Sequence, residues 1–476
     1  MIASCRHSTG PGTMPRNHPE EAMKPITNPA EPLCTSRRTF LGRSAACCGG
    51  ITLLFSRRSF AAPSPAAAPA ATPSRPDVAS IDRSRILAAA DRYLGLPPTP
   101  LTSLPCPRSL GTAHDYYSEA DPDMDYDTAT GDGEGPAEAK KAKTEPLFTA
   151  HRDALFQLGL AVPALSAAYL LTAEDRYAQH AILHLRAWFV DPATRMSPRL
   201  DYGHVVLKPA LPADQVDPYA VTSSAQHPAG SFEGILETLP LVEVAISIPF
   251  LSASPGFTAD DRSSVHAWFA AYLQWLINPE DSGPRLPALA RDQKDHHATS
   301  WLLQTSAYSW LAVPAGDAAR AEDSALAHLR HRFRTITLRA QIKYDGTFPH
   351  ELDSPNPYRN SLFNLDMLAG ICQLLSTRFE GVWDYELDDG PGMRSAIAYH
   401  FPFIANRATW PFRADATDFD LLPLRRASLL LSARAYDRPE YAALWMRLNP
   451  GPAPPEILRT LPIKQPLLWI SGPSKV

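Results

Sequence analysis

Along most of the chain beyond Arg85, apolar residues recur every three or four positions, which is the period of an amphipathic helix. The clearest stripes are Leu155, Leu158, Val162, Leu165 and Tyr169; Val265, Trp268, Phe269, Tyr272, Leu273 and Leu276; and Leu362, Leu365, Leu368, Ile371, Cys372 and Leu375. The period-two alternation of a half-buried strand is nearly absent. The pattern predicts an all-α fold, with helical hairpins arranged as an (α/α) toroid or incomplete barrel. Without a short repeat of fixed period, a regular solenoid is disfavoured.

Residues 1–62 have the pattern of an export signal. Ser36–Leu41 reads Ser-Arg-Arg-Thr-Phe-Leu, the form of a twin-arginine motif, and a modest apolar stretch follows from Ala45 to Phe55. Small residues then provide a cleavage site near Ala61 or Ala62. Because the apolar stretch is too short to span a bilayer, we expect no stable membrane insertion and a periplasmic or secreted protein.

The rest of the chain divides into a linker and one large domain. Residues 63–84 are rich in alanine and proline, a composition typical of a flexible linker. Residues 85–476 are predicted to form a single domain with a large core. Within it, Asp121–Lys143 is rich in Asp, Gly, Glu and Lys and has no apolar face, so we expect a mobile segment that could cover a cleft.

Composition excludes several classes of function. The formal net charge is -5 and no basic stripe is present, which argues against a nucleic-acid partner. Of six cysteines, Cys106 and Cys372 alone lie beyond the signal region, and they permit either one disulfide or two unpaired thiols. Two histidine pairs could each supply half a metal site, but no third ligand is evident and no metal is expected; they are His180 with His184 and His328 with His331.

The segment Lys294–Thr299, Lys-Asp-His-His-Ala-Thr, concentrates ionisable groups directly before a strongly periodic helix. It combines a cation, a carboxylate and two adjacent imidazoles. Histidine changes its charge near neutral pH, and a helix N-terminus attracts negative charge. The segment therefore predicts proton transfer on an anionic substrate. Capping or packing by these histidines is the structural alternative.

Further ionisable and aromatic groups gather in predicted loops and at helix edges, where a toroid would present them on one rim. They are His114–Glu119, His151–Arg152, Tyr202–His204, Asp345–Glu351 and Pro357–Ser361. Structural alternatives stay open for several of them. Arg152 could bridge to a neighbouring carboxylate, Glu351 could orient a histidine or hold its loop, and Tyr358 could pack within its loop.

These stretches, taken together, resemble the alginate lyase family of polysaccharide lyases. The resemblance runs from about Leu104 to Ile404 and rests on His114–Glu119, His151–Arg152, Leu185–Met196, Tyr202, Lys294–His297, Asp345–Leu352 and Ser361–Leu365. It implies an (α/α) toroid, cleavage of an acidic, uronate-containing polysaccharide by β-elimination, and no organic cofactor. In such a reaction donors neutralise the uronate carboxylate, a base removes the C5 proton, and an acid protonates the departing O4.

The resemblance assigns His297 as the family histidine, acting as base or as neutraliser of the carboxylate. His296 stands where the family has asparagine, and an imidazole can also donate to a carboxylate. Ser354 and Asn360 stand at the positions of the usual arginine and catalytic tyrosine. A tryptophan-rich run of the family is missing, with Asp123–Asp132 in its place.

Tyr358 and Arg359, beside Asn360, could supply a phenol and a guanidinium from a changed loop. We therefore expect catalysis by His297, His296 and Tyr358. The residues expected to bind substrate are Arg359, Asn360, Lys294, Tyr202, His204, Arg152, Tyr117, Glu351 and Trp301.

Two other classes of function remain open. An inverting glycoside hydrolase on a similar helical toroid could use Asp295 and Glu351 across a water molecule. Alternatively, the chain could be a catalytically weakened relative that binds acidic sugars, because Ser354 and Asn360 replace the usual catalytic types. The unsaturated product of a lyase would separate these classes.

Overall fold

The computed structural model describes residues 73–120, 146–206, 230–278, 286–312, 324–377 and 379–472. The helices are α1 (Val78–Ile81), α2 (Arg83–Tyr93), α3 (Ala150–Thr172), α4 (Asp175–Leu185), α5 (Leu241–Leu251), α6 (Ala259–Ile277), α7 (Leu286–Arg291), α8 (His296–Ala312), α9 (Ala325–Arg332), α10 (Leu338–Gln341), α11 (Pro349–Leu352), α12 (Pro357–Leu375), α13 (Met393–Ala405), α14 (Ala427–Tyr436), α15 (Pro439–Arg447), α16 (Pro455–Arg459) and α17 (Pro466–Ser471). The prediction of a helical fold is confirmed.

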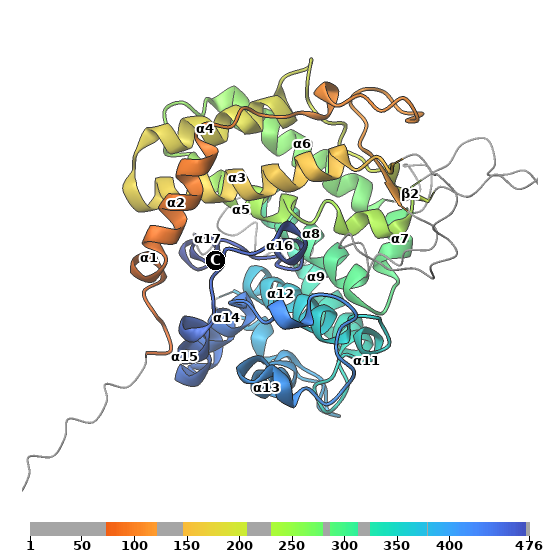
Figure 1. The fold of residues 1–476 in the computed structure, drawn as a ribbon, viewed down its shortest axis with the longest axis vertical. Coiled ribbons are helices and arrows are strands. Elements are labelled where there is room, and N and C mark those ends of the chain that lie inside the picture. Colours follow the sequence, from red (N-terminus) through yellow and green to blue (C-terminus); the bar gives the residue numbers. More distant parts are fainter. Residues whose placement is uncertain are drawn as a thin grey trace, which may run out of the picture. The chain divides into compact units, whose positions relative to one another are not determined.

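The helices pack as a continuous series of neighbours. Helix α3 contacts α2, α4 and α5, helix α8 contacts α5, α6 and α12, and α12 in turn contacts α14, which pairs with α15. Figure 1 shows α3 and α5 in one half of this domain and α12 and α14 in the other, with α16 and α17 between them. The predicted stripes on α3, α6 and α12 face the core, because one apolar face per helix must be covered by a neighbour.

Within the described residues, the named strands form one small sheet. Strand β1 (Tyr117–Ala120) pairs in parallel with β2 (Tyr202–Val206), and Tyr117 lies opposite Tyr202. The 3-10 turn η5 (Phe232–Leu236) contacts β2 and leads toward α5. This sheet therefore brings three segments that are distant in the sequence to one place beside α8.

A local carboxylate and a distant one fix the beginnings of two functional helices. Asp295 precedes α8 and accepts the backbone N–H of His297 at 3.0 Å. Asp415 accepts the backbone N–H groups of Tyr358 and Arg359 at 2.8 and 2.9 Å, at the first turn of α12. Because the first amides of a helix lack partners within the helix, such acceptors stabilise its start.

Several expectations about the ends and loops need correction. Residues 78–84, expected in the linker, lie in α1 and α2, and Val78 is buried. Cys106 and Cys372 are both free thiols, so the disulfide alternative is wrong. The signal region, the predicted mobile segment Asp121–Lys143 and the acidic run Asp123–Asp132 lie outside the described residues.

Two helical stretches are long and apolar enough to cross a membrane by length and composition, Ala150–Thr172 and Phe232–Leu251. Most of each is buried inside the domain. Because α3 and α5 pack against one another, their apolar surfaces are covered by protein. Both stretches therefore have the character of core helices.

Candidate active site

The paired histidines lie in the first turn of α8, where the sequence places them. His297 Nδ1 lies 3.0 Å from Asp295 Oδ1, and His296 Nδ1 lies 2.8 Å from Glu351 Oε2. Glu351 belongs to the short helix α11, so residues 55 positions apart form this contact. The prediction that Glu351 could orient a histidine is confirmed. Each imidazole is therefore held by its own carboxylate.

The two imidazole rings lie against each other. Their centroids are 4.5 Å apart and their planes are inclined by 28°. Phe363 contacts His296 edge-on and Phe232 contacts His297 edge-on, so aromatic neighbours confine both rings. When a carboxylate accepts the proton on Nδ1, the neutral ring carries its basic lone pair on Nε2. The arrangement thus presents two oriented imidazoles side by side.

Asp295 is held in its charged form. Burial raises the pKa of its carboxyl group, but the hydrogen bond from His297 and the nearby imidazole charges have the larger combined effect. The pKa therefore lies well below the usual range. Gln341 also donates to the Asp295 carbonyl at 2.9 Å, and Asn364 of α12 donates to Gln341 at 2.9 Å. Helices α10 and α12 therefore fix the segment that carries the histidines.

A second cluster surrounds His204 on β2. His204 Nδ1 lies 3.3 Å from Glu237 and His204 Nε2 lies 3.1 Å from Glu233, so both ring nitrogens face carboxylates. Tyr116 and Ser118 also donate their hydroxyl groups to Glu237. Burial lowers the pKa of His204, but the hydrogen bonds that its ring donates to the two carboxylates outweigh this effect and raise the pKa to about 9. His204 is therefore a buried cation at neutral pH.

The backbone of His204 has a left-handed conformation, with φ of 55°. A residue with a side chain rarely adopts it, at a cost of roughly 1 to 2 kcal/mol. The His204 amide donates to Ser118 Oγ at 2.7 Å, which holds the strained backbone against β1. Burial raises the pKa of Glu233, but the hydrogen bond and charge of His204, together with the charges of His297 and His296, lower it below its usual value. Glu233 therefore links the two clusters electrostatically.

Replacing His204 by glutamine should remove a pH-dependent stabilisation. Since the folded pKa of about 9 exceeds the usual 6.5, the stabilisation is complete below pH 6.5 and is lost as the pH rises through 9. The difference in unfolding free energy between wild type and His204→Gln should therefore shrink by roughly 3 kcal/mol over this window. Urea unfolding at several pH values measures it. The exposed His331→Gln variant is the control, and a His204→Gln difference that stays constant with pH would contradict the charged state.

The structure brings several predicted residues to one cavity. His296, Arg359 and Asn360 line it together with Glu237. Arg359 donates to Thr417 at 3.2 Å, and Asn360 donates to Ser354 at 3.0 Å. The two residues at the family's usual catalytic positions thus contact each other.

Other predicted residues lie at the edge of this site. Lys294 lines a surface depression of about 260 Å³ with Asp295 and His350. Tyr202 is partly exposed at the start of β2. The substrate-binding roles of Lys294 and Tyr202 stay predictions. Arg152 helps to lower the pKa of Glu237, which burial alone would raise, so its alternative role beside a neighbouring carboxylate fits the structure.

Three predicted site residues serve the core instead. Tyr358 is fully buried, donates to the Phe403 carbonyl at 3.1 Å and packs on Trp410, so its assignment as the catalytic acid is wrong. Burial raises its pKa far above the usual range.

Trp301 is the second of these residues. Its indole donates to the Leu276 carbonyl at 3.0 Å and is buried between helices, which does not favour its predicted role in substrate binding. Tyr117, the third, donates to Glu119 at 2.8 Å, and Glu119 is held by Arg108 through two contacts of 2.6 Å. Tyr117 is buried as well, so its predicted contact with substrate is also wrong.

Sequence reasoning missed Glu233 and Glu237. They stand four positions apart in and after η5, a spacing that puts two carboxylates on one helical face. That spacing was the available signal. Their partner His204 comes from another segment, so the cluster depends on the parallel pairing of β1 with β2.

Asp295, His296 and His297 have ligand atoms within 4.8 Å of one another, close enough to hold a metal ion. The ring geometry opposes this use. An imidazole binds a metal in the plane of its ring, and two stacked rings direct their lone pairs side by side rather than toward one point. Both Nδ1 atoms also face carboxylates. The cluster is better suited to proton transfer than to metal coordination.

The histidine pairs outside this cluster have structural contacts. His180 Nε2 lies 2.8 Å from the Leu96 carbonyl, and the ring of His184 packs edge-on against the ring of His180. Burial and the neighbouring His180 lower the pKa of His184 to about 4, so its ring is neutral.

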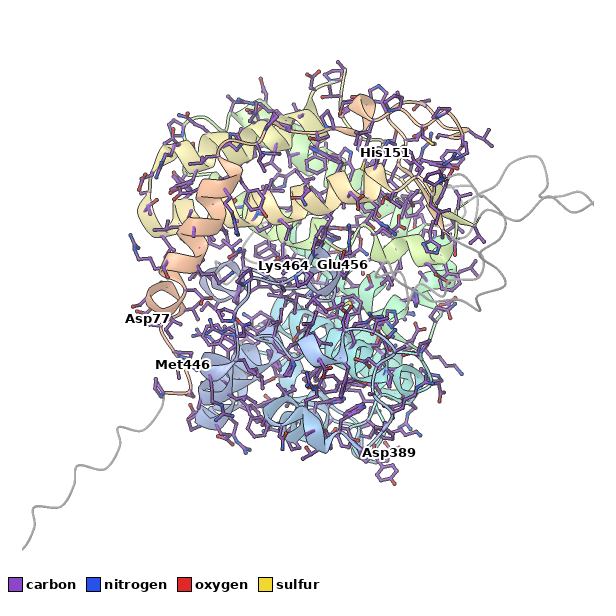
Figure 2. All side chains as sticks on the ribbon, viewed as in Figure 1. Asp77, His151, Asp389, Met446, Glu456 and Lys464 are labelled. Atoms are coloured by element: carbon purple, nitrogen blue, oxygen red, sulfur yellow. The ribbon has the colours of Figure 1, made fainter. Side chains whose placement is uncertain are left out.

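His151 at the start of α3, labelled in Figure 2, accepts the Tyr117 amide and lies 2.8 Å from the Leu104 carbonyl.

Comparison with known proteins agrees with this arrangement. The profile of the alginate lyase family matches residues 102–410, more than half of the chain. The chain belongs to the alginate lyase family. This membership makes the chain a polysaccharide lyase. The match includes α3, α8 and α12, whereas α14 to α17 lie beyond it.

Two solved structures resemble this alginate lyase family member. An alginate lyase from Bacteroides ovatus is 20% identical, with a TM-score of 0.62, and the alignment covers 81% of this chain and 93% of that one. Alginate lyase A1-III from Sphingomonas species A1 is 12% identical, with a TM-score of 0.40 and coverage of 74% and 86%. A search of curated protein sequences found no match. The first similarity confirms the (α/α) toroid.

Proposed function

We propose that this polysaccharide lyase cleaves an alginate-like polyuronate by β-elimination, with the stacked imidazoles of His297 and His296 as its proton-transfer groups. The observation that carries the proposal is that each ring is tied through Nδ1 to a separate carboxylate. Two rings fixed in this way can hold opposite protonation states. The buried Tyr358 is not needed as the acid.

Elimination needs one proton removed from the uronate and one proton delivered to the leaving oxygen. Nε2 of neutral His297 removes the proton from C5 of the uronate. The electron pair forms the C4–C5 double bond as the C4–O4 bond breaks, and the departing O4 takes a proton from the imidazolium of His296. Exchange with solvent then restores both rings. Arg359 and Asn360, which share the cavity with His296, donate to the uronate carboxylate and lower the cost of the developing charge.

The same geometry disfavours glycoside hydrolysis. An inverting hydrolase needs one carboxylic acid that holds its proton, and therefore one carboxyl group with a raised pKa. Asp295 has a lowered pKa, and Glu351 lies against His296. Each of the two carboxylates is in contact with an imidazole, so neither is the protonated acid that the reaction requires. Their contacts suit orientation of the imidazoles rather than direct attack on a sugar.

The activity test uses the purified protein with polymannuronate, polyguluronate, polyglucuronate and a neutral glucan. We expect ultraviolet absorbance from the unsaturated uronate to rise in step with reducing ends on at least one polyuronate, with no change after addition of a chelator. Reducing ends without absorbance would contradict the lyase and support a hydrolase. Binding without either signal would support a weakened sugar-binding relative.

We also propose export through the twin-arginine motif at Arg37 and Arg38. An acidic polysaccharide is too large to cross a bacterial inner membrane freely, so a lyase that acts on the intact polymer has to meet it outside the cytoplasm. Replacing both arginines by lysine should leave the protein in the cytoplasmic fraction. Unchanged export of the double variant would contradict this proposal.

A further inference from the structure

The cavity lined by His296 has a second wall, formed by a segment beyond the family match. Arg459 and Lys464, which flank the turn between α16 and α17, line it together with Arg359. Figure 2 shows Lys464 near the middle of the domain, at the level where α16 and α17 lie between its two halves. The cavity has a volume of about 80 Å³, several times the roughly 10 to 15 Å³ that one water molecule needs. It can therefore admit part of a ligand.

The backbone of Lys464 is held by a buried carboxylate. Glu243 of α5 accepts the amides of Lys464 and Gln465, both at 2.9 Å, and the indole N–H of Trp469 at 3.1 Å. Glu243 is 1% exposed, so these donors replace its contacts with water. The three hydrogen bonds attach the C-terminal segment to α5 and fix the point from which the Lys464 side chain projects.

The ammonium group of Lys464 lies beside an aromatic ring and interacts electrostatically with the Glu243 carboxylate. It lies 5.6 Å from the centre of the Phe156 ring. Within the part of the chain that the structure describes, no carboxylate oxygen lies within ion-pair distance of Lys464 Nζ. Burial lowers the pKa of this group to about 8, against the raising effect of the Glu243 carboxylate, which agrees with a cation partly removed from water.

Two other charged groups of the cavity, Arg459 and Glu237, have partners within the protein. Arg459 donates to Asp153 at 2.6 Å and stacks on Phe156. Glu237 is held by His204 and by two hydroxyl groups. The Lys464 ammonium group therefore leaves the cavity with a positive charge that a ligand can match. An anionic group is the ligand that such a wall favours.

We propose that Lys464 binds the carboxylate of the uronate adjacent to the sugar that undergoes elimination. This inference rests on the proposed function, because it takes the histidine pair as the reaction centre. The C-terminal segment would then determine specificity by requiring a second carboxylate beside the reacting sugar. A neutral sugar at that position gives the ammonium group no carboxylate to bind and therefore binds more weakly.

The test compares Lys464→Met with the exposed control Lys343→Met, using polyuronate oligomers of defined length. Loss of one charge-assisted hydrogen bond should raise KM about 10- to 100-fold for Lys464→Met and leave kcat within about twofold. Lys464→Arg should recover part of the affinity. Calorimetry with a saturated uronate trimer on a His297→Ala background should show the same loss, whereas a carboxyl-reduced trimer should bind both proteins equally weakly.

The outcomes separate the two proposals. An active wild type with unchanged KM and unchanged trimer affinity in Lys464→Met overturns the role of Lys464 alone. Absence of unsaturated product from wild type overturns the proposed function, and the calorimetric comparison still reports on the carboxylate site. Thermal unfolding of each variant checks the fold. If Lys464→Met does not fold, Lys464→Gln supplies the same loss of charge with a polar side chain.

Discussion

Replacing His297 by alanine should lower kcat by roughly 10² to 10⁴-fold, because a positioned base contributes about this factor to proton transfer. KM should change much less, since the carboxylate donors Arg359 and Asn360 remain in place. Initial rates of ultraviolet absorbance on the best polyuronate measure the effect. His331→Ala is the matched control, because His331 is exposed on α9 and lies outside the cavity. Equal activity of the two variants would remove His297 from the mechanism.

Asp295→Asn tests the same base without deleting it. The amide oxygen can still accept the backbone N–H of His297, so the start of α8 should be retained. The amide cannot stabilise the imidazolium that forms on proton removal, and it can favour the wrong tautomer by donating to Nδ1. We expect kcat to fall by roughly 10²-fold or more with an unchanged unfolding temperature. A wild-type kcat in this variant would show that Asp295 serves only as a helix cap.

Sequence patterns predicted the helices because burial repeats with the helical period. Leu155, Leu165 and Leu368 belong to predicted stripes and are fully buried on α3 and α12. The position of His296 and His297 at a helix start followed equally from local signals, since Asp295 is a typical capping residue. Features that depend on a few neighbouring residues were thus accessible before the structure.

Features that depend on distant residues were not accessible. Pro357–Ser361 was expected to be a loop, yet the carboxylate of Asp415 caps it as the first turn of α12. Successive residues on a helix point about 100° apart, so Arg359 lines the cavity while Tyr358 turns into an aromatic core. The contribution of Lys464 likewise depends on Glu243, more than two hundred positions earlier.

Replacing Arg426 by leucine should destabilise the domain more than any surface change. Arg426 is 1% exposed and lies 2.9 Å from the Asp366 carboxylate of α12, which is itself fully buried. Asp366 also accepts the Ser428 amide at 2.9 Å and so caps α14. Removing the guanidinium leaves a buried carboxylate without its cation, at a cost of about 3 to 5 kcal/mol. Equilibrium urea unfolding measures this loss.

The matched control is Arg339→Leu, which breaks the exposed pair between Arg339 and Asp389 and should cost less than about 1 kcal/mol. The double variant Arg426→Leu with Asp366→Leu should recover part of the stability, because two apolar side chains remove the unpaired charge. If Arg426→Leu costs no more than Arg339→Leu, the buried pair contributes little. Arg426 also donates to the Thr460 carbonyl at 3.3 Å, next to the segment that carries Lys464. A destabilised α12–α14 contact should therefore weaken substrate binding before the domain unfolds, since it releases the cavity wall that the C-terminal segment supplies.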